Sequence, residues 1–130
     1  MSLPEDYGRF PLRDFLGMEL TEVGDGRATA HIDIAAQHLN PNGVVHGAVL
    51  FALVDTAMGG AAMSVLPAGQ FATSVDIQFR FIRPASTGSL IAAVEVLKQG
   101  RHVIHLEGRI DGDDGRVVAT AAGTFTTIGG

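Results

Sequence analysis

The residues best suited to chemistry lie in one short loop and on the apolar segment that follows it. Residues 40–47 are rich in turn-forming types, and residues 48–66 contain a single charged residue, Asp55. A loop that enters a helix presents unpaired backbone N–H groups and the positive end of the helix dipole. A carboxylate on an apolar helix is costly to bury unless it has a function. The pattern predicts a site that stabilises an oxyanion and attacks a carbonyl carbon, or activates water against it.

The elements that must position these residues are mostly strands. Residues 17–23 and 27–34 are expected to be strands joined by a turn at 24–26, after a short helical or irregular lead-in at 8–16. After the helix, apolar residues recur at every second position, which predicts strands at 71–82, 90–98, 101–110 and 117–128. The first of these is expected to carry on one face Phe71, Thr73, Val75, Ile77, Phe79 and Phe81. Because only one long helix can cover the sheet, the expected fold is α+β, a curved antiparallel sheet wrapped around a central helix.

Composition narrows the class of protein. The length of 130 residues predicts one domain, 1–130. The absence of cysteine excludes a disulfide framework, a thiol nucleophile and a Cys-type zinc site, and favours a cytoplasmic protein. A net charge of −5 argues against a nucleic-acid partner. Residues 1–10 lack the apolar core of a secretory signal. Residues 44–66 are a poor membrane span because they contain His46, Asp55 and several glycines. We therefore expect this segment to be a buried core helix, and we expect no membrane partner.

The loop and helix carry an ordered set of residues: Asn40, Gly43, His46, Gly47 and Asp55. This set resembles the hot-dog fold acyl-CoA thioesterases of the phenylacetic-acid-degradation (PaaI-like) branch. Residues 74–76, 81–84 and 119–125 support the resemblance, which covers residues 10–128. One departure is Ala48, where the family often has a second glycine, and there we expect a tighter entrance. The resemblance implies the hot-dog fold and hydrolysis of an acyl-CoA to free acid and CoA, with CoA entering as part of the substrate and no other cofactor and no metal required.

One helix cannot bring Gly47 and Asp55 to the same carbonyl. They are eight residues apart, or roughly 12 Å along the axis, whereas a nucleophile must lie within about 3.5 Å of the carbon and an oxyanion donor about 3 Å from the oxygen. Either the two residues serve different purposes, or a second subunit supplies one of them. Two helices packed antiparallel across a two-fold axis would place Gly47 of one chain opposite Asp55 of the other, twice. The resemblance implies the same arrangement, so we expect a homo-oligomer, a homodimer or a homotetramer built from two dimers.

Gly47 and Asp55 have specific expected roles and structural alternatives. The Gly47 N–H would polarise the carbonyl, and glycine permits close approach, but a packing glycine is the alternative. Asp55 would act as a nucleophile that forms a mixed anhydride or as a general base for water, and the sequence leaves these two open. A carboxylate that caps a neighbouring helix or pairs with an arginine across the dimer is the structural alternative.

Three further residues are candidates for positioning the reactants. Asn40 matches the family position that orients the carbonyl or the lytic water, although asparagine before proline is also ordinary turn chemistry. His46 either holds the loop or donates to the carbonyl. Ser74 aligns with a position that can hold water near the carboxylate, and Thr73 is its competitor if the register slips by one.

Cations near strand ends could contact the phosphates of the CoA nucleotide, and a solvated surface is the alternative for each. The candidates are Arg80, Arg83, Lys98, Arg101 and His102. Arg83 and Arg101 are preferred because each lies at a strand end near a turn. His102 and His105 are three apart in an expected strand, so they point to opposite faces and do not suggest a metal site.

The apolar end of the helix indicates what acyl group could fit. The Gly59-Gly60 pair would allow a second helix or the sheet to approach closely, or leave room for an acyl group. With Ala61, Ala62 and Met63 it predicts a small apolar pocket wall, suited to a small, medium-chain or aromatic acyl group. Two alternatives keep the fold: a dehydratase or hydratase acting on acyl thioesters, and a non-catalytic acyl-CoA binding protein.

Overall fold

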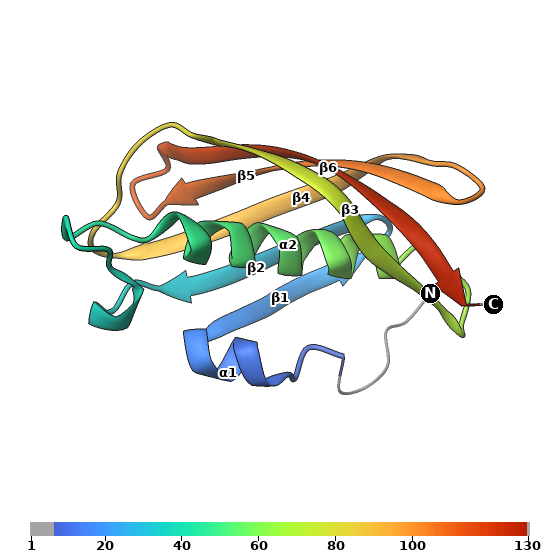
Figure 1. Ribbon diagram of the computed structural model, residues 1–130, viewed down its shortest axis with the longest axis horizontal. Helices are drawn as coiled ribbons and strands as arrows, with labels where there is room; N and C mark the ends of the chain where they lie inside the picture. The colour runs from blue at the N-terminus through green and yellow to red at the C-terminus, as the bar shows by residue number, and fades with distance from the viewer. Residues whose placement is uncertain (1–6, 130) are drawn as a thin grey trace.

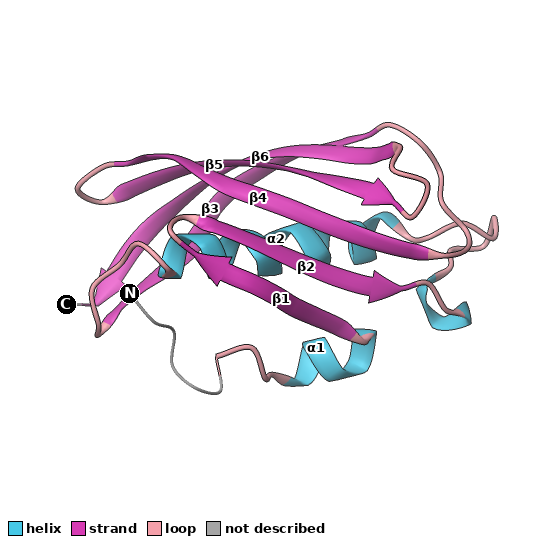
Figure 2. Cartoon of the chain, turned by 180° about the vertical axis from the view of Figure 1, so that it is seen from behind, coloured by secondary structure: helices cyan, strands magenta, loops and turns pink. Residues whose placement is uncertain are grey.

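The computed structural model describes residues 7–129, in which six antiparallel strands form one sheet around a central helix (Figures 1 and 2). The strand order is β1-β2-β4-β5-β6-β3. The elements along the chain are α1 (Pro11–Leu16), β1 (Met18–Gly24), β2 (Arg27–Asp33), a short 3-10 turn (Ala36–His38), α2 (Gly47–Met63), β3 (Gln70–Phe81), β4 (Ser89–Gln99), β5 (Val103–Gly112) and β6 (Val117–Gly129). The expected architecture, a curved antiparallel sheet wrapped around one helix, is confirmed.

Polar side chains fix both ends of α2. At its start, the backbone of His46 is extended and Nδ1 of its ring accepts a hydrogen bond from the Ala48 N–H at 2.9 Å. At its end, the Ser64 hydroxyl donates to the Ala61 carbonyl at 2.7 Å and accepts from the Gly26 N–H at 2.8 Å. The helix therefore ends at Met63, three residues before the expected boundary at Leu66, because Ser64 ties the chain to the β1–β2 turn.

Small residues let α2 lie close to the sheet. The inward side chains of β2, such as Ala30 and Ile32, are fully buried, and so are Leu53 and Ala57 on the facing side of the helix. A Cβ added at Gly60 would lie 3.1 Å from Cδ2 of Leu20 on β1, so this glycine does permit the close approach of the sheet. Within residues 7–129, no helix is long and apolar enough to cross a membrane.

Strand β3 contains a bulge that changes which residues face the helix. Its pairing with β6 shifts register between Ser74 and Asp76, so Val75 is an extra residue. The predicted alternation was therefore wrong for the first half of the strand, where Phe71, Thr73 and Val75 are exposed, while Ile77 and Phe79 in the second half are partly buried. Beyond Val75 the side chains of β3 alternate in the opposite sense. Ser74, just before the bulge, lines a cavity that is also lined by residues of α2.

The buried His38 ties the chain before β1 to the loop before α2. Its Nδ1 accepts from the Ala35 N–H at 2.9 Å, and its Nε2 lies 2.7 Å from the Leu16 carbonyl, to which it donates. We expect His38→Ala to lower the free energy of unfolding by about 2–4 kcal/mol, since it leaves a cavity and two polar groups without partners. Urea denaturation measures the change, and the exposed His105→Ala is the matched control, expected within about 0.5 kcal/mol of wild type. Equal stability of the two variants would contradict this account.

Candidate active site

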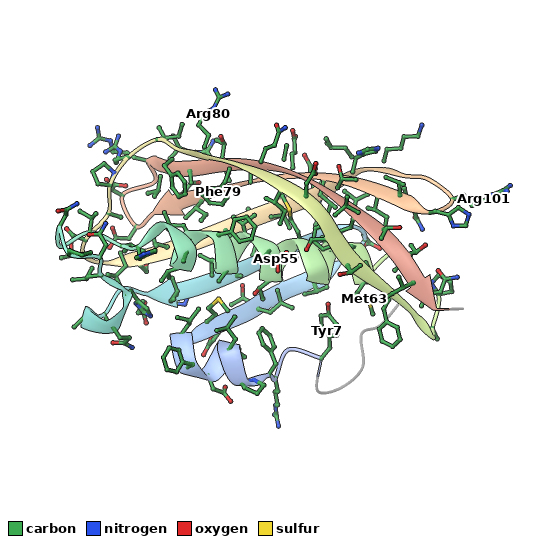
Figure 3. The ribbon with its side chains drawn as sticks, in the orientation of Figure 1. Tyr7, Asp55, Met63, Phe79, Arg80 and Arg101 are labelled. Atoms are coloured by element: carbon green, nitrogen blue, oxygen red, sulfur yellow. The ribbon has the colours of Figure 1, made fainter. Side chains whose placement is uncertain are left out.

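A cavity of about 390 Å³ opens over the middle of α2, in the strip that the sheet leaves uncovered between its two edge strands, β1 and β3. Asp55 and Gly59 of α2 line it, with Thr73 and Ser74 of β3 on one side and Leu20 of β1 on the other. Figure 3 shows Asp55 at the centre of the helix. The structure thus brings together two of the predicted site residues, Asp55 and Ser74.

Burial makes it harder to ionise Asp55 than an ordinary aspartate. Burial raises the pKa of the Asp55 carboxyl above that of an ordinary aspartate, and the Ser74 hydroxyl, by hydrogen bonding to the carboxylate, lowers it again in part. A raised pKa makes a carboxylate a stronger base, which suits the transfer of a proton or an attack on carbon. Thr73 and Ser74 both line the cavity, and Ser74 is the one whose hydroxyl lowers the pKa of the Asp55 carboxyl.

Tyr7 is a cavity residue that the sequence did not single out. A Cβ added at Gly59 would lie 3.4 Å from the Tyr7 hydroxyl oxygen, so the phenol lies directly over this glycine, one turn beyond Asp55. Burial, and then the charge of Asp55, raise the pKa of the Tyr7 hydroxyl, which places the phenol within electrostatic reach of the carboxylate. No periodic pattern marks the lead-in segment. The signal that could have drawn attention to it is that Tyr7 is the one tyrosine in the chain.

The entrance of α2 offers one unpaired backbone donor. The Ala48 N–H bonds to the His46 ring, and the Val49 and Leu50 N–H groups bond to the His46 carbonyl. The Gly47 N–H has no acceptor among residues 7–129. Glycine also has a packing role here, because a Cβ would lie 3.1 Å from the Phe81 ring. Both the chemical and the structural interpretation of Gly47 therefore fit the geometry.

Asn40 and His46 have structural roles beside Gly47. The Asn40 side-chain oxygen accepts from the Asn42 N–H at 2.9 Å and from the Val44 N–H at 3.3 Å, so its carbonyl holds the loop and its NH₂ group is the part left to reach a ligand. Since Nδ1 of His46 accepts a hydrogen bond, the neutral ring carries its proton on the other nitrogen, Nε2, as a donor on an exposed side chain. Asn40, His46 and Gly47 thus lie together where the chain enters α2, about two helical turns before Asp55.

The predicted phosphate-binding cations lie in two places. Figure 3 shows Arg80 and Arg101 toward opposite ends of the molecule. Arg83 follows β3 close to Ala85, whose carbonyl accepts from the Val45 N–H at 2.8 Å, so it lies beside the entrance of α2. Lys98 and Arg101 flank Gln99, whose side chain donates to the Val65 carbonyl at 3.0 Å, beyond the other end of the helix. A single chain therefore does not gather these cations into one group.

The predicted pocket wall is partly wrong. Ala61, Ala62 and Met63 are buried in the core between helix and sheet and do not line the cavity at Asp55. Gly59 is the glycine that lines it, and Gly60 faces β1 instead. Among the described residues, no cluster of three or more histidine, aspartate or glutamate side chains is arranged to hold a metal ion.

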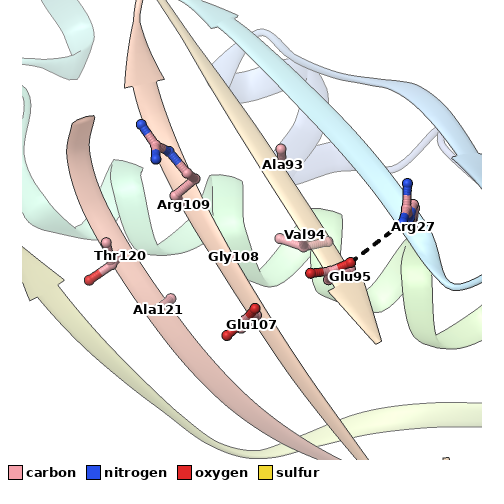
Figure 4. Close-up of a pocket in the computed structure, with 9 residues that line it drawn as sticks. All are labelled: Arg27, Ala93, Val94, Glu95, Glu107, Gly108, Arg109, Thr120 and Ala121. Atoms are coloured by element: carbon pink, nitrogen blue, oxygen red, sulfur yellow. Dashed lines mark ion pairs between the residues drawn. The ribbon is translucent and has the colours of Figure 1, made fainter. Parts of the chain in front are cut away.

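A second hollow, of about 500 Å³, lies on the other face of the sheet, across β2, β4, β5 and β6 (Figure 4). Two of its charged residues pair with neighbours, Arg27 with Glu95 at 3.8 Å and Arg109 with Asp111 at 2.6 Å. The helix lies behind the sheet from this side, so neither Asp55 nor the entrance of α2 reaches this hollow. The cavity at Asp55 is therefore the better candidate site.

Comparison with known families identifies the class of protein. Residues 42–119, which span the α2 entrance, Asp55 and Ser74, match the thioesterase superfamily. The chain belongs to this superfamily and is a thioester hydrolase with the hot-dog fold.

Individual relatives agree with this assignment. The acyl-coenzyme A thioesterase PaaI of Escherichia coli K12 is 32% identical over 117 residues, covering 88% of this chain and 81% of PaaI. The solved structure of the E. coli PaaI protein aligns with a TM-score of 0.85 at 29% identity, over 92% of this chain and 85% of that one. The conserved protein PA5202 of Pseudomonas aeruginosa aligns with a TM-score of 0.91 at 27% identity, over 95% and 98% of the two chains. The resemblance to PaaI-like thioesterases is thus confirmed.

The raised pKa of Asp55 gives a testable pH dependence. If the charged carboxylate is the active form, kcat/KM falls on the acid side at a pH above that expected for an ordinary aspartate. Because the Ser74 hydroxyl lowers this pKa, we expect Ser74→Ala to move the acidic limb of the profile to higher pH. Thr73→Ala is the matched control and should leave the limb in place. A limb that moves with Thr73→Ala instead would refute the assigned register.

Proposed function

We propose that this chain is a cytoplasmic acyl-CoA thioesterase that acts on small, medium-chain or aromatic acyl groups, with each active site completed by two copies of the chain. Gly47 of one chain and Asp55 of the partner subunit would flank the same thioester. The observation that carries this proposal is the unpaired Gly47 N–H and the half-buried Asp55 carboxylate on one helix, at a separation that one carbonyl cannot bridge. The absence of cysteine is compatible with a reducing compartment.

Exposed apolar side chains on α2 and β3 support association with a second copy. Phe51 of α2 and the β3 residues Val75 and Phe81 are 40%, 61% and 59% exposed. The rings of Phe51, Phe79 and Phe81 form two successive tilted pairs, with centroids 6.0 and 4.8 Å apart. β3 is also an edge strand, which pairs on one side only within residues 7–129. A second copy placed against this edge by a two-fold axis would cover these side chains and meet the open strip of α2.

The proposed chemistry is acyl transfer to water. The carboxylate of Asp55 either attacks the thioester carbon, forming a mixed anhydride that water then opens, or removes a proton from the water that attacks. In both routes negative charge develops on the carbonyl oxygen, where the Gly47 N–H and the helix dipole stabilise it. The carbon–sulfur bond breaks, and the sulfur leaves as CoA thiolate, which takes up a proton. Asn40 and Ser74 would position the carbonyl and the water, and the Nε2 proton of His46 is a further donor.

The name of the relative PaaI, an acyl-coenzyme A thioesterase, supports an acyl-CoA substrate. Arg83 is the best-placed cation for its phosphates because it lies beside the helix entrance, and Arg80, Lys98 and Arg101 are the other candidates. In a dimer, cations from both chains could serve one nucleotide.

The test is release of free thiol from acetyl-, butyryl-, octanoyl- and phenylacetyl-CoA, followed with a thiol-reactive dye. Hydrolysis of at least one of them by the wild-type protein is the expected result. Hydration of crotonyl-CoA without thiol release would instead support the hydratase alternative, and tight binding without turnover would support a non-catalytic binding protein.

A further inference from the structure

Part of the wall of the cavity at Asp55 comes from residues of the N-terminal part of the chain. Tyr7 and Phe10 precede α1, and Leu12 lies in its first turn, yet all three line the cavity together with α2 and β3. Most of the remaining lining is apolar or small, including Leu20, Ala52 and Phe125. An apolar cavity with one reactive carboxylate suits the acyl part of a substrate, whereas the phosphates of CoA would need cations, which this lining lacks.

The positions of Asp55 and Tyr7 define the direction in which an acyl chain would extend through the cavity. Gly59 follows Asp55 by one helical turn, roughly 6 Å along the axis, and the Tyr7 hydroxyl lies over Gly59. An acyl group whose carbonyl carbon is held at Asp55 and which extends along the helix toward Gly59 meets the hydroxyl end of the Tyr7 side chain within that turn. The ring is partly buried, so it is held in place by its neighbours.

We propose that Tyr7 sets the length of the acyl chain that the enzyme accepts, by closing the cavity beyond Gly59. The inference rests on the proposed function and adds a specificity-determining residue to it. The effect is steric: the side chain, whose hydroxyl end lies over Gly59, blocks longer chains. Within the space between Asp55 and Tyr7, each additional buried methylene should raise kcat/KM about fourfold, and beyond that limit kcat/KM should fall.

The experiment compares kcat/KM for saturated acyl-CoA substrates from C2 to C12 between the wild-type protein and Tyr7→Ala. We expect the optimum of Tyr7→Ala to move to longer chains, with a gain of about tenfold over wild type for the first substrate beyond the wild-type limit. Tyr7→Phe, which removes only the hydroxyl that lies over Gly59, should move the optimum by no more than about one methylene, less than Tyr7→Ala. Gly59→Ala, which places a methyl group on the cavity floor, should move the optimum to shorter chains.

Phe15→Ala is the matched control, because Phe15 is an aromatic residue of α1 that is 76% exposed and lies outside the cavity. Its length profile should equal that of the wild type. An unchanged optimum in Tyr7→Ala, or an equal loss at every chain length, would overturn the role of Tyr7 while leaving the thioesterase proposal intact. Absence of thiol release by the wild-type protein at every length would overturn the proposed function itself, and this inference with it.

Discussion

Asp55→Asn is expected to lower kcat for thioester hydrolysis by about a thousandfold, and at the same time to make the protein more stable at neutral pH. The amide keeps the shape of the side chain but can neither attack carbon nor accept a proton from water. The gain in stability follows from the raised pKa. Because the fold disfavours the charged carboxylate, stability is lost as the pH rises from the pKa of the unfolded chain through the higher pKa of the folded one. An uncharged residue removes this penalty.

Steady-state kinetics and thermal unfolding of the same preparation measure the two effects. Asp76→Asn is the matched control, since Asp76 is an exposed aspartate on β3 that does not line the cavity. It should change neither kcat nor Tm appreciably. Retention of most of the activity by Asp55→Asn would show that the carboxylate is structural, and loss of both activity and stability would contradict the electrostatic argument.

Two inactive variants are expected to restore activity when they are mixed. Gly47→Pro removes the backbone donor at the first residue of α2, a helix position that suits proline, and the His46 backbone (ψ 137°) already has the conformation that precedes proline. The added Cβ would lie 3.1 Å from the Phe81 ring, so Gly47→Ala, which adds the same Cβ but keeps the N–H, is the steric control and should remain active. No hydrogen bond among residues 7–129 is lost, since this N–H has no acceptor there. If each site uses Gly47 from one chain and Asp55 from the other, a mixed dimer of Gly47→Pro and Asp55→Ala has one intact site and one doubly altered site.

Co-refolding equal amounts of the two variants should therefore give about a quarter of the wild-type activity, because half of the dimers are mixed and half of their sites are intact. Each variant refolded alone is the control and should stay inactive. Activity that fails to recover, although mixed dimers are detected by differential tagging, would mean that both residues act within one chain.

The loop and the helix were predictable because local rules govern them. Turn-forming residues ahead of an apolar segment mark a helix start, and the alternation of Ala28, Ala30 and Ile32 marks a half-buried strand, as the structure has it. The bulge at Val75 was not predictable, since an extra residue in one strand depends on its pairing with β6 and leaves no periodic signal. The predicted alternation therefore placed Phe71, Thr73 and Val75 on the same face as Ile77 and Phe79, which is wrong. Ser74 had nevertheless been chosen correctly as a candidate near Asp55.

Tertiary contacts decided the remaining differences. Tyr7 reaches the cavity only because the chain before α1 folds back over the open strip of α2. Ala61 and Ala62 belong to the core because the sheet wraps their side of the helix and leaves the side of Asp55 and Gly59 open. A sequence reveals that a helix is apolar, but the wrapping of the sheet determines which side of it remains accessible.

The bulge in β3 also bears on how many molecules can assemble. A long, straight outer strand with exposed apolar side chains can recruit copy after copy and grow into a fibre. The extra residue at Val75 interrupts the ladder of N–H and C=O groups near the middle of β3, so an incoming strand finds only a short regular segment to match. Growth by strand addition would thereby be discouraged, so the dimer proposed at this border would remain a finite, closed particle.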